Sequence, residues 1–320
     1  MTLKENPIGV PGVSRIMDTP HREKCMNRYY FIINPVAGAG RASKAFDIIE
    51  NSLTPKGIDY EYDVSLYPGH AIELTRAALA RGEKCIVSVG GDGTLREVAQ
   101  VMAGTGAALG IVPSGTGNDF AKALGIPMND AEAALNTLLK GKILPTDAGL
   151  ANDNFFVNVA GFGFDADTVA NTDSFKKKFH GMVPYMLGVI RTLLRLRTLD
   201  LKVTANGETF QVKSIMFDAA NGTHFGGGMN VAPLADTSDG MLDIIIVKAL
   251  GRLTFLSLLT KFVKGKHTAL PQVMYFKAPE VTVECKQHSL LNMDGELGSG
   301  TPATFKVLPG ALNIIVPDLR

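Results

Sequence analysis

The 320-residue chain has few cysteines and almost no excess of charge. Its three cysteines, Cys25, Cys85 and Cys285, are far apart and odd in number. They favour neither a disulfide framework nor a zinc site, and they indicate a reducing compartment. The 32 basic and 31 acidic residues give a formal net charge of +1, which argues against a general nucleic-acid-binding protein. An apolar content of 46% is typical of a globular protein.

Long hydrophobic runs are also missing. No stretch approaches the roughly 20 apolar residues that a membrane-spanning helix needs. Residues 1–27 contain no apolar segment of signal-peptide length and are rich in Pro, Gly and charge, so we expect an N-terminal arm there. These absences favour a cytoplasmic protein and leave peripheral association with a membrane open.

The pattern of apolar runs and turn residues changes near residue 143. In residues 28–143 short apolar runs alternate with helical patterns, which predicts a layered α/β domain with a mostly parallel sheet. In residues 144–320 short β-rich runs are separated by Gly, Asn and Asp turns, which predicts a β-sandwich or a similar antiparallel domain. We therefore expect an α/β + β protein with two domains after the arm.

Three strand-to-helix loops of the first domain carry glycines. They are INPVAGAGRASK (33–44), VSVGGDGTLREV (87–98) and IVPSGTGNDFAKALG (111–125). The carboxyl ends of neighbouring parallel strands meet at one edge of the sheet, and open α/β sheets bind their ligands there. Helix N-termini with glycine turns also bind phosphate. The three loops together therefore predict a nucleotide phosphate site.

Asp92, which lies among three glycines in the second loop, has two interpretations. A helix N-terminus carries about half a positive charge, and glycine lets a phosphate lie on the backbone. A carboxylate at that place repels phosphate unless a divalent cation lies between them, which predicts a metal ion. Alternatively, Asp92 only caps the helix that follows it.

Five segments follow one another in a specific order. They are NPVAG (34–38), GGDGT (90–94), GTGNDFA (115–121), PLADTSDGMLD (233–243) and NMDGE (292–296). In this order they closely resemble the diacylglycerol kinase catalytic family, particularly its soluble bacterial lipid kinases. The resemblance covers about residues 28–316, whereas GGDGT alone is shared with NAD kinases. It implies an α/β nucleotide domain, a β-sandwich domain, and phosphorylation of a lipid hydroxyl by ATP with Mg²⁺.

The resemblance also implies catalytic and nucleotide-binding residues. Glu296 is the candidate proton acceptor for the lipid hydroxyl, and Asp294 shares or assists that role. By itself, NMDGE would be a plain Asp-Gly hairpin turn. The residues implied to bind ATP are Asn34, Pro35, Ser65, Gly90, Gly91, Asp92, Gly93, Thr94, Leu95, Arg96 and Thr116. Ser65 stands where the family often has threonine, so the hydroxyl is kept.

Two magnesium sites are implied as well. For the catalytic Mg²⁺ the candidate ligands, partly through water, are Asp92, Asp119 and Asp147. For a structural Mg²⁺ the candidates are the Asp239 carboxylate and the backbone carbonyls of Asp236 and Met241. Hard oxygen ligands in a tight loop suit this cation. The alternative for the second site is a simple turn that begins at Asp239.

Two segments are basic and amphipathic. Residues 174–202 carry seven basic residues and one acid, and residues 248–267 carry five basic residues and no acid. Such segments can lie on anionic lipid surfaces, although an apolar stripe more commonly faces the core. Gly188, Arg191, Thr192 and Arg195 share one helical face of the first segment. The apolar stripe of the second segment is Phe255, Leu256, Leu259, Phe262 and Val263.

Three functions stay open. The leading one is a lipid kinase that acts on diacylglycerol or a related lipid alcohol at the membrane surface. An NAD kinase-like enzyme with a soluble substrate explains GGDGT, but it does not explain GTGNDFA followed by DGE. A non-catalytic nucleotide-binding regulator would have lost the catalytic carboxylates, yet Asp92, Asp294 and Glu296 are present. No nucleic-acid partner is expected, and a homodimer stays open.

Overall fold

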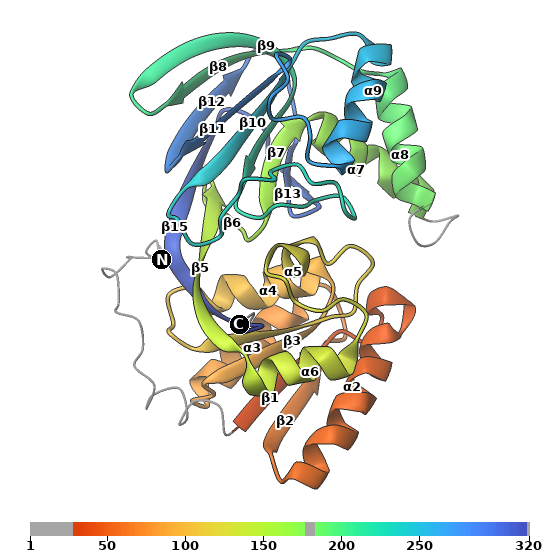
Figure 1. The fold of residues 1–320 in the computed structure, drawn as a ribbon, viewed down its shortest axis with the longest axis vertical. Helices are drawn as coiled ribbons and strands as arrows, with labels where there is room; N and C mark the ends of the chain where they lie inside the picture. The colour runs from red at the N-terminus through yellow and green to blue at the C-terminus, as the bar shows by residue number, and fades with distance from the viewer. Residues whose placement is uncertain (1–27, 177–182, 319–320) are drawn as a thin grey trace, which may run out of the picture.

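Two long strands, β5 (Lys142–Ala151) and β15 (Ala303–Val316), run through both domains (Figure 1). They pair antiparallel from Lys142 opposite Val316 to Ala151 opposite Phe305, with an irregularity between Leu308 and Leu312. Each domain therefore completes its sheet with strands that continue into the other domain. The predicted boundary near residue 143 falls at the start of β5.

The computed structural model describes residues 28–176 and 183–318. The expected N-terminal arm lies outside the described residues, as do Lys177 and Lys178 of the basic segment 174–202. Within the described parts of the chain, no helix is long and apolar enough to cross a membrane.

The first domain is a parallel sheet between two layers of helices (Figure 1). Its strands, in spatial order, are β2 (Asp59–Val64), β1 (Arg28–Ile33), β3 (Cys85–Gly90) and β4 (Ala108–Pro113), followed by the end of β15. The helices α3 (His70–Ala80), α4 (Asp92–Met102) and α5 (Asp119–Ala123) cover one face, and α2 (Arg41–Leu53) and α6 (Ala131–Lys140) cover the other. Short 3-10 helices lie at η1 (Ala37–Ala39) and η2 (Thr54–Lys56).

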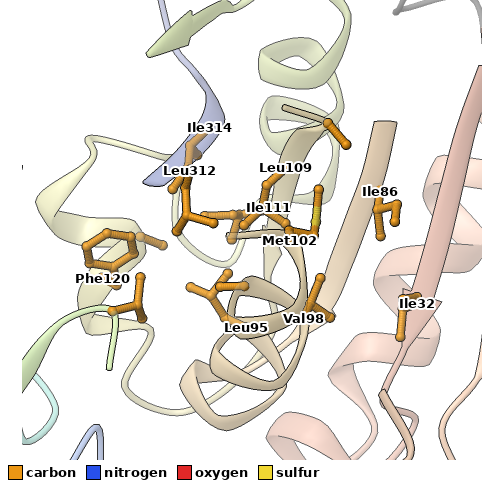
Figure 2. Close-up of a cluster of buried hydrophobic side chains, with 14 of the residues drawn as sticks. Ile32, Ile86, Leu95, Val98, Met102, Leu109, Ile111, Phe120, Leu312 and Ile314 are labelled. Carbon is orange, nitrogen blue, oxygen red and sulfur yellow. The ribbon is translucent and has the colours of Figure 1, made fainter. Parts of the chain in front are cut away.

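The inner strands β1, β3 and β4 are almost entirely apolar because both of their faces are buried, whereas the edge strand β2 (DYEYDV) is largely exposed. In β1, Tyr30 and Ile32 face α3 and α4, whereas Phe31 and Ile33 face α2 and α6. Successive side chains of a strand point to opposite faces, so a strand between two helical layers reads as a continuous apolar run. Figure 2 shows the first of these cores, where α4 and Phe120 pack on the sheet.

In the residues that the structure describes, the second domain consists of antiparallel strands with three helices. The strands are β6 (Asn154–Phe156), β7 (Val159–Gly163), β8 (Leu199–Ala205), β9 (Glu208–Ala220), β10 (Leu242–Lys248), β11 (Val273–Ala278), β12 (Glu280–Cys285), β13 (Leu291–Met293) and β14 (Glu296–Gly298). The helices are α7 (Phe164–Lys176), α8 (Val183–Leu194) and α9 (Arg252–Val263). The structure thus confirms the predicted α/β + β architecture with a C-terminal β-sandwich domain.

The sandwich encloses an aromatic core. The ring of Phe217 from β9 lies 5.0 Å from that of Phe162 and 5.2 Å from that of Phe305. On the opposite face of β9, Met216 and Ala220 belong to a second core that α7 and α9 cover. The predicted apolar stripe of α9 is therefore only partly correct. The buried side chains of α9 are Phe255, Leu258 and Phe262, whereas Leu256 and Val263 of the predicted stripe are exposed.

Candidate functional site

The three glycine loops meet at one edge of the parallel sheet, as predicted. A Cβ atom on Gly115 would lie 2.5 Å from the Cα of Gly91, and one on Gly38 would lie 1.9 Å from the carbonyl oxygen of Ser114. Real side chains do not tolerate such contacts, so only glycine lets these backbones approach. The result is a surface of bare backbone at the carboxyl ends of β1, β3 and β4.

Polar side chains tie the loops together. Asn34 donates from Nδ2 to Thr94 Oγ1 at 2.9 Å, which joins the first loop to the second. Arg41 donates to the carbonyl oxygens of Gly38 at 3.0 Å and Gly115 at 2.7 Å, which joins the first loop to the third. The sequence analysis missed Arg41, although its place directly after the glycine turn, as the first residue of α2, was a usable signal.

Asp92 does not cap α4. The helix begins at Asp92 with Gly91 as its N-cap, and no side chain makes a capping hydrogen bond there. The Oδ1 atom of Asp92 is buried and has no hydrogen-bond partner. The alternative interpretation of Asp92 as a helix cap is therefore wrong. The carboxylate instead faces inward from a helix N-terminus, where backbone N–H groups lack intrahelical partners and favour anions.

Asp92 and Asp119 converge on the same glycine. A Cβ atom on Gly117 would lie 3.0 Å from Asp92 Oδ2 and 3.3 Å from Asp119 Oδ2. Burial raises the pKa of Asp92 to about 6, and the negative charges of Asp119 and Asp294 add to that effect. Asp119 itself accepts a hydrogen bond from Lys122 Nζ at 3.1 Å.

This carboxylate pair fits a magnesium ion. Mg²⁺ takes oxygen ligands, commonly one or two carboxylates with phosphate oxygens and water, and a cation would remove the repulsion within the pair. The described residues contain no cluster of three or more His, Cys, Asp or Glu side chains that could hold a metal ion. Asp92 and Asp119 would therefore need phosphate and water to complete the coordination.

Asp147 lies apart from this pair, in contact with the 236–241 loop. Its carboxylate accepts hydrogen bonds from Gly310 N and Gly240 N, both at 2.7 Å. Burial raises the pKa of Asp147, and the charges of Asp239 and Asp236 act in the same direction. Among the contacts of the described residues, none joins Asp147 to Asp92 or Asp119. Its role in the catalytic Mg²⁺ network stays a prediction.

A lysine side chain lies beside the acidic residues of the 236–241 loop. Lys277 Nζ lies 2.5 Å from Asp239 Oδ2 and 3.3 Å from Asp243 Oδ2. The other carboxylate oxygen of Asp239 accepts a hydrogen bond from Met241 N at 3.0 Å. With the ammonium group in this position, the Asp239 carboxylate has a positive counter-charge from the chain itself. The structural site at Asp236, Asp239 and Met241 stays a prediction.

Asp294 anchors a hairpin. Asp294 and Gly295, with φ angles of 52° and 93°, form the two-residue turn between β13 and β14. The Asp294 carboxylate accepts hydrogen bonds from three successive backbone N–H groups, those of Val157 at 2.7 Å and of Asn158 and Val159 at 3.0 Å. This carboxylate therefore positions the turn, and its part in accepting the substrate proton stays a prediction.

Glu296 meets the nucleotide loops through an ion pair across 200 residues of sequence. Its side chain is 55% exposed and pairs with Arg96 of α4. Arg96 also donates from Nε to the carbonyl oxygen of Phe155 at 3.0 Å, which fixes the guanidinium between the domains. The predicted proton acceptor and the predicted ATP loop are thus in direct contact.

The remaining predicted nucleotide residues are divided between surface and core. Pro35 lies in the first loop, Ser65 N donates to the Ile33 carbonyl oxygen at 2.8 Å, and Thr116 is exposed at the third loop. Leu95 is an exception, because its side chain is buried in the core of Figure 2 and its N–H donates to Gly91 O.

A second acidic pair lies buried behind the hairpin. Asp165 accepts a hydrogen bond from Asn292 Nδ2 at 3.0 Å, and Asn292 Oδ1 accepts one from Gly295 N at 2.9 Å. Burial raises the pKa of Asp165 to about 7. Burial and the neighbouring charge of Asp165 raise the pKa of Asp218 well above its usual range. A proton shared between the two carboxyl groups would satisfy buried oxygens of Asp165 and Asp218 that otherwise have no hydrogen-bond partner. The sequence did not identify either residue.

The site agrees with the known proteins to which the chain is similar. The family model described as "Diacylglycerol kinase catalytic domain" matches residues 28–151, and the one described as "YegS C-terminal NAD kinase beta sandwich-like domain" matches residues 158–316. The diacylglycerol kinase of Mycobacterium tuberculosis (strain ATCC 25618 / H37Rv) is 33% identical over 293 residues, which cover 89% of this chain and 94% of that protein. The chain belongs to the diacylglycerol kinase family.

Other members of the diacylglycerol kinase family agree over the same extent. The diacylglycerol kinase of Bacillus subtilis (strain 168) is 30% identical over 294 residues, which cover 91% of this chain and 97% of that protein. A crystal structure of a diacylglycerol kinase from Bacillus anthracis str. Sterne superposes with a TM-score of 0.75 at 28% identity, covering 91% of this chain and 98% of that one. The matches span both domains, which confirms the family resemblance seen in the five segments.

Proposed function

We propose that this kinase transfers the γ-phosphoryl group of ATP to the hydroxyl of diacylglycerol or a related lipid alcohol, with Mg²⁺, as a cytoplasmic protein at the membrane surface. The observation that carries the proposal is that a carboxylate pair, the glycine loops and Glu296 lie together. The Asp92–Asp119 pair lies under the glycine loops, and Glu296 of the other domain reaches these loops through Arg96.

The protein groups have separate tasks in this reaction. Backbone N–H groups at the start of α4 and in the glycine loops bind the phosphates, and Arg96 adds positive charge beside them. Asp92 and Asp119 would hold Mg²⁺, which supplies charge neutralisation at the phosphates when bound. Asp294 fixes the hairpin that carries Glu296.

The proton and bond changes balance with this chain's own residues. The lipid hydroxyl oxygen bonds to the γ-phosphorus while the bond from that phosphorus to the bridging oxygen breaks, and ADP leaves. The hydroxyl proton goes to the Glu296 carboxylate, which returns it to water. The contact with Arg96 orients this carboxylate and keeps it beside the loops. Phosphoryl transfer depends mostly on such positioning and charge stabilisation.

The other two functions have less support. An NAD kinase-like enzyme accounts for GGDGT and the sandwich, but not for GTGNDFA followed by the DGE hairpin. A regulator without turnover has no need of an exposed Glu296 beside the nucleotide loops.

A substrate panel tests the proposal. The full chain is incubated with radiolabelled ATP, Mg²⁺ and mixed micelles that contain diacylglycerol, a sphingoid base or another lipid alcohol, with NAD as the control. Labelled phosphatidate is the expected product. Labelled NADP without any labelled lipid would replace the proposal by the NAD kinase-like alternative.

A further inference from the structure

Two buried side chains and a glycine form a row across three strands of the second domain. Asn292 of β13 lies opposite Gly161 of β7, and Gly161 lies opposite Asp218 of β9. Residues directly opposite each other in an antiparallel pair point to the same face of the sheet. Asn292 and Asp218 therefore share a face, with no side chain between them. In Figure 1, β13 lies at the end of the second domain that faces α4 and α5.

The glycine leaves room for a carboxylate under α7. A Cβ atom on Gly161 would lie 2.1 Å from Asp218 Oδ1, so a larger residue there would displace the Asp218 side chain. The helix α7 covers this face of the sheet, because Met216, on the same face of β9, packs in one core with Phe164 of α7. Asp165, the second residue of α7, reaches the row from this helix.

Asn292 joins the buried row to the turn that carries Glu296. Its Nδ2 donates to Asp165 Oδ2 at 3.0 Å, and its Oδ1 accepts from Gly295 N at 2.9 Å. One amide group therefore binds the helix with its donor and the turn with its acceptor. The reversed amide would point its NH₂ group at the N–H of Gly295, and two donors do not bind each other. The acceptor on Asp165 thus fixes the orientation in which Asn292 holds the turn.

A shared proton keeps Asp165 in the acceptor role. The Oδ1 atom of Asp165 and both carboxylate oxygens of Asp218 are buried without a hydrogen-bond partner. Burial raises the pKa of both carboxyl groups, and the charge of Asp165 adds to the effect on Asp218. A proton held between Asp165 Oδ1 and Asp218 leaves Asp165 Oδ2 unprotonated, so that it can accept from Asn292.

We propose that Asp165 is a positioning residue for phosphoryl transfer, which acts through Asn292 on the turn that carries Glu296. The inference rests on the proposed function, in which Glu296 accepts the proton of the lipid hydroxyl. Glu296 directly follows this turn, whose residues Asp294 and Gly295 have φ angles of 52° and 93°. Such angles are unfavourable for a residue with a side chain, so the surrounding contacts have to hold the turn.

Loss of the Asp165 contact is expected to move Glu296 and to leave the nucleotide loops in place. The Asp294 carboxylate still binds three backbone N–H groups at the start of β7, so the hairpin remains attached to the sheet. A misplaced proton acceptor lowers the rate of the chemical step, whereas nucleotide binding depends on the other domain. The expected signature is a fall in kcat with an unchanged KM for ATP.

Paired substitutions of Asp165 test the inference in the full chain. Asp165→Leu removes the acceptor, whereas Asp165→Asn can still accept from Asn292 with its oxygen and donate to Asp218 with its NH₂ group. With ATP, Mg²⁺ and a water-dispersed short-chain diacylglycerol, kcat should fall at least about tenfold in Asp165→Leu. Asp165→Asn should recover most of that loss, and the KM for ATP should stay unchanged in both variants.

Asp167→Asn is the matched control from the same turn of α7. The two carboxylate oxygens of Asp167 each accept a hydrogen bond from Arg197 at 2.7 Å. Among the hydrogen bonds of the described residues, none joins Asp167 to Asn292. Loss of either acidic residue can lower the melting temperature, but only the loss of the Asp165 acceptor should lower kcat. An equal fall in kcat for Asp167→Asn would mean that general stability, and not positioning, is responsible.

Two further measurements keep the test decisive if Asp165→Leu does not fold. Asn292→Ala breaks the same connection and should show the same fall in kcat, and adding Asp165→Leu to it should cost nothing more. Hydrogen exchange over residues 291–298 should be faster in these variants than in the wild type or Asp165→Asn. Near-normal kcat, additive losses or unchanged exchange would overturn the inference. A wild type without diacylglycerol turnover would overturn the proposed function, whereas the exchange data would still show whether Asp165 holds the turn.

Discussion

At the residue scale, buried carboxylates are the unusual feature of this protein. Asp92, Asp165 and Asp218 have raised pKa values, and burial is the main cause for each. Each of them has at least one buried oxygen without a hydrogen-bond partner, which costs stability, so its retention indicates a ligand or a shared proton. Asp92 faces the glycine loops, which indicates a ligand. The Asp165–Asp218 pair lies behind the hairpin, which indicates a shared proton.

Replacing Asp92 separates metal binding from stability. The Asp92→Asn variant should stay folded, with a metal-free melting temperature equal to or above that of the wild type, because a buried repelling charge is removed. It should lose most of the added stability that Mg²⁺ with ATP gives the wild type, a gain that follows RT ln(1 + [L]/Kd). Thermal melts with ATP, with and without Mg²⁺, measure both effects. A full Mg²⁺-dependent gain in the variant would remove Asp92 from the site.

The Asp165–Asp218 pair predicts a pH dependence of stability. Both pKa values are raised on folding, so the native state binds more protons than the unfolded state from about pH 4 up to at least pH 7, where Asp165 titrates. The free energy of unfolding therefore falls as the pH rises through this window, by at most about 1.4 kcal/mol per pH unit for each proton. Urea unfolding at pH 5, 6, 7 and 8 should show this fall in the wild type and a flatter profile in Asp218→Asn. Parallel profiles would contradict the shared proton.

At the element scale, carboxylates at turns are held by contacts from the chain itself. Beside the 236–241 loop, the Lys277 ammonium group pairs with both Asp239 and Asp243. In the hairpin, three backbone N–H groups surround Asp294. Both sets of contacts fix a turn, because they give its carboxylate a counter-charge or hydrogen-bond donors.

The lysine predicts how the 236–241 loop responds to metal. Lys277→Met keeps the length of the side chain and removes its charge, so the acidic residues around it lose their counter-ion. We expect a lower melting temperature that added Mg²⁺ partly restores, whereas Mg²⁺ should leave the wild type nearly unchanged when ATP is absent. Lys202→Met is the matched control, because its ion pair with Glu284 is exposed and such pairs contribute about 0–1 kcal/mol. A wild type that melts much higher with Mg²⁺ alone would mean that the ion displaces Lys277.

At the scale of the whole molecule, the active groups come from both domains. The strands β5 and β15 continue from one domain into the other, and the Arg96–Glu296 pair joins the nucleotide loops to the hairpin. The hairpin carries the proposed proton acceptor, whereas the loops carry the proposed nucleotide-binding groups. Substitution of the hairpin should therefore change the rate of phosphoryl transfer and leave nucleotide binding in place.

The test is Glu296→Gln. The amide keeps the shape and cannot accept the proton, so turnover should fall by about 10²–10⁴-fold. The affinity for ATP, measured by calorimetry, should stay within a few-fold of the wild type, since the loops are untouched. Asp153→Asn, an exposed carboxylate in the turn between β5 and β6, is the control and should keep full activity. Near-normal turnover of Glu296→Gln would remove Glu296 from the mechanism.

The sequence alone determined the two-domain architecture, the three glycine loops and the family, because these depend on periodicity and on local order of residue types. Strands buried on both faces read as apolar runs, and glycines mark the turns where backbones touch. The tertiary structure alone decided which distant groups meet. It showed that Asp294 is an anchor, that Asp147 contacts the 236–241 loop, and that Lys277 neutralises that loop. Sequence spacing carries no record of these contacts, because β15 and the hairpin reach them only after the chain has folded back across both domains.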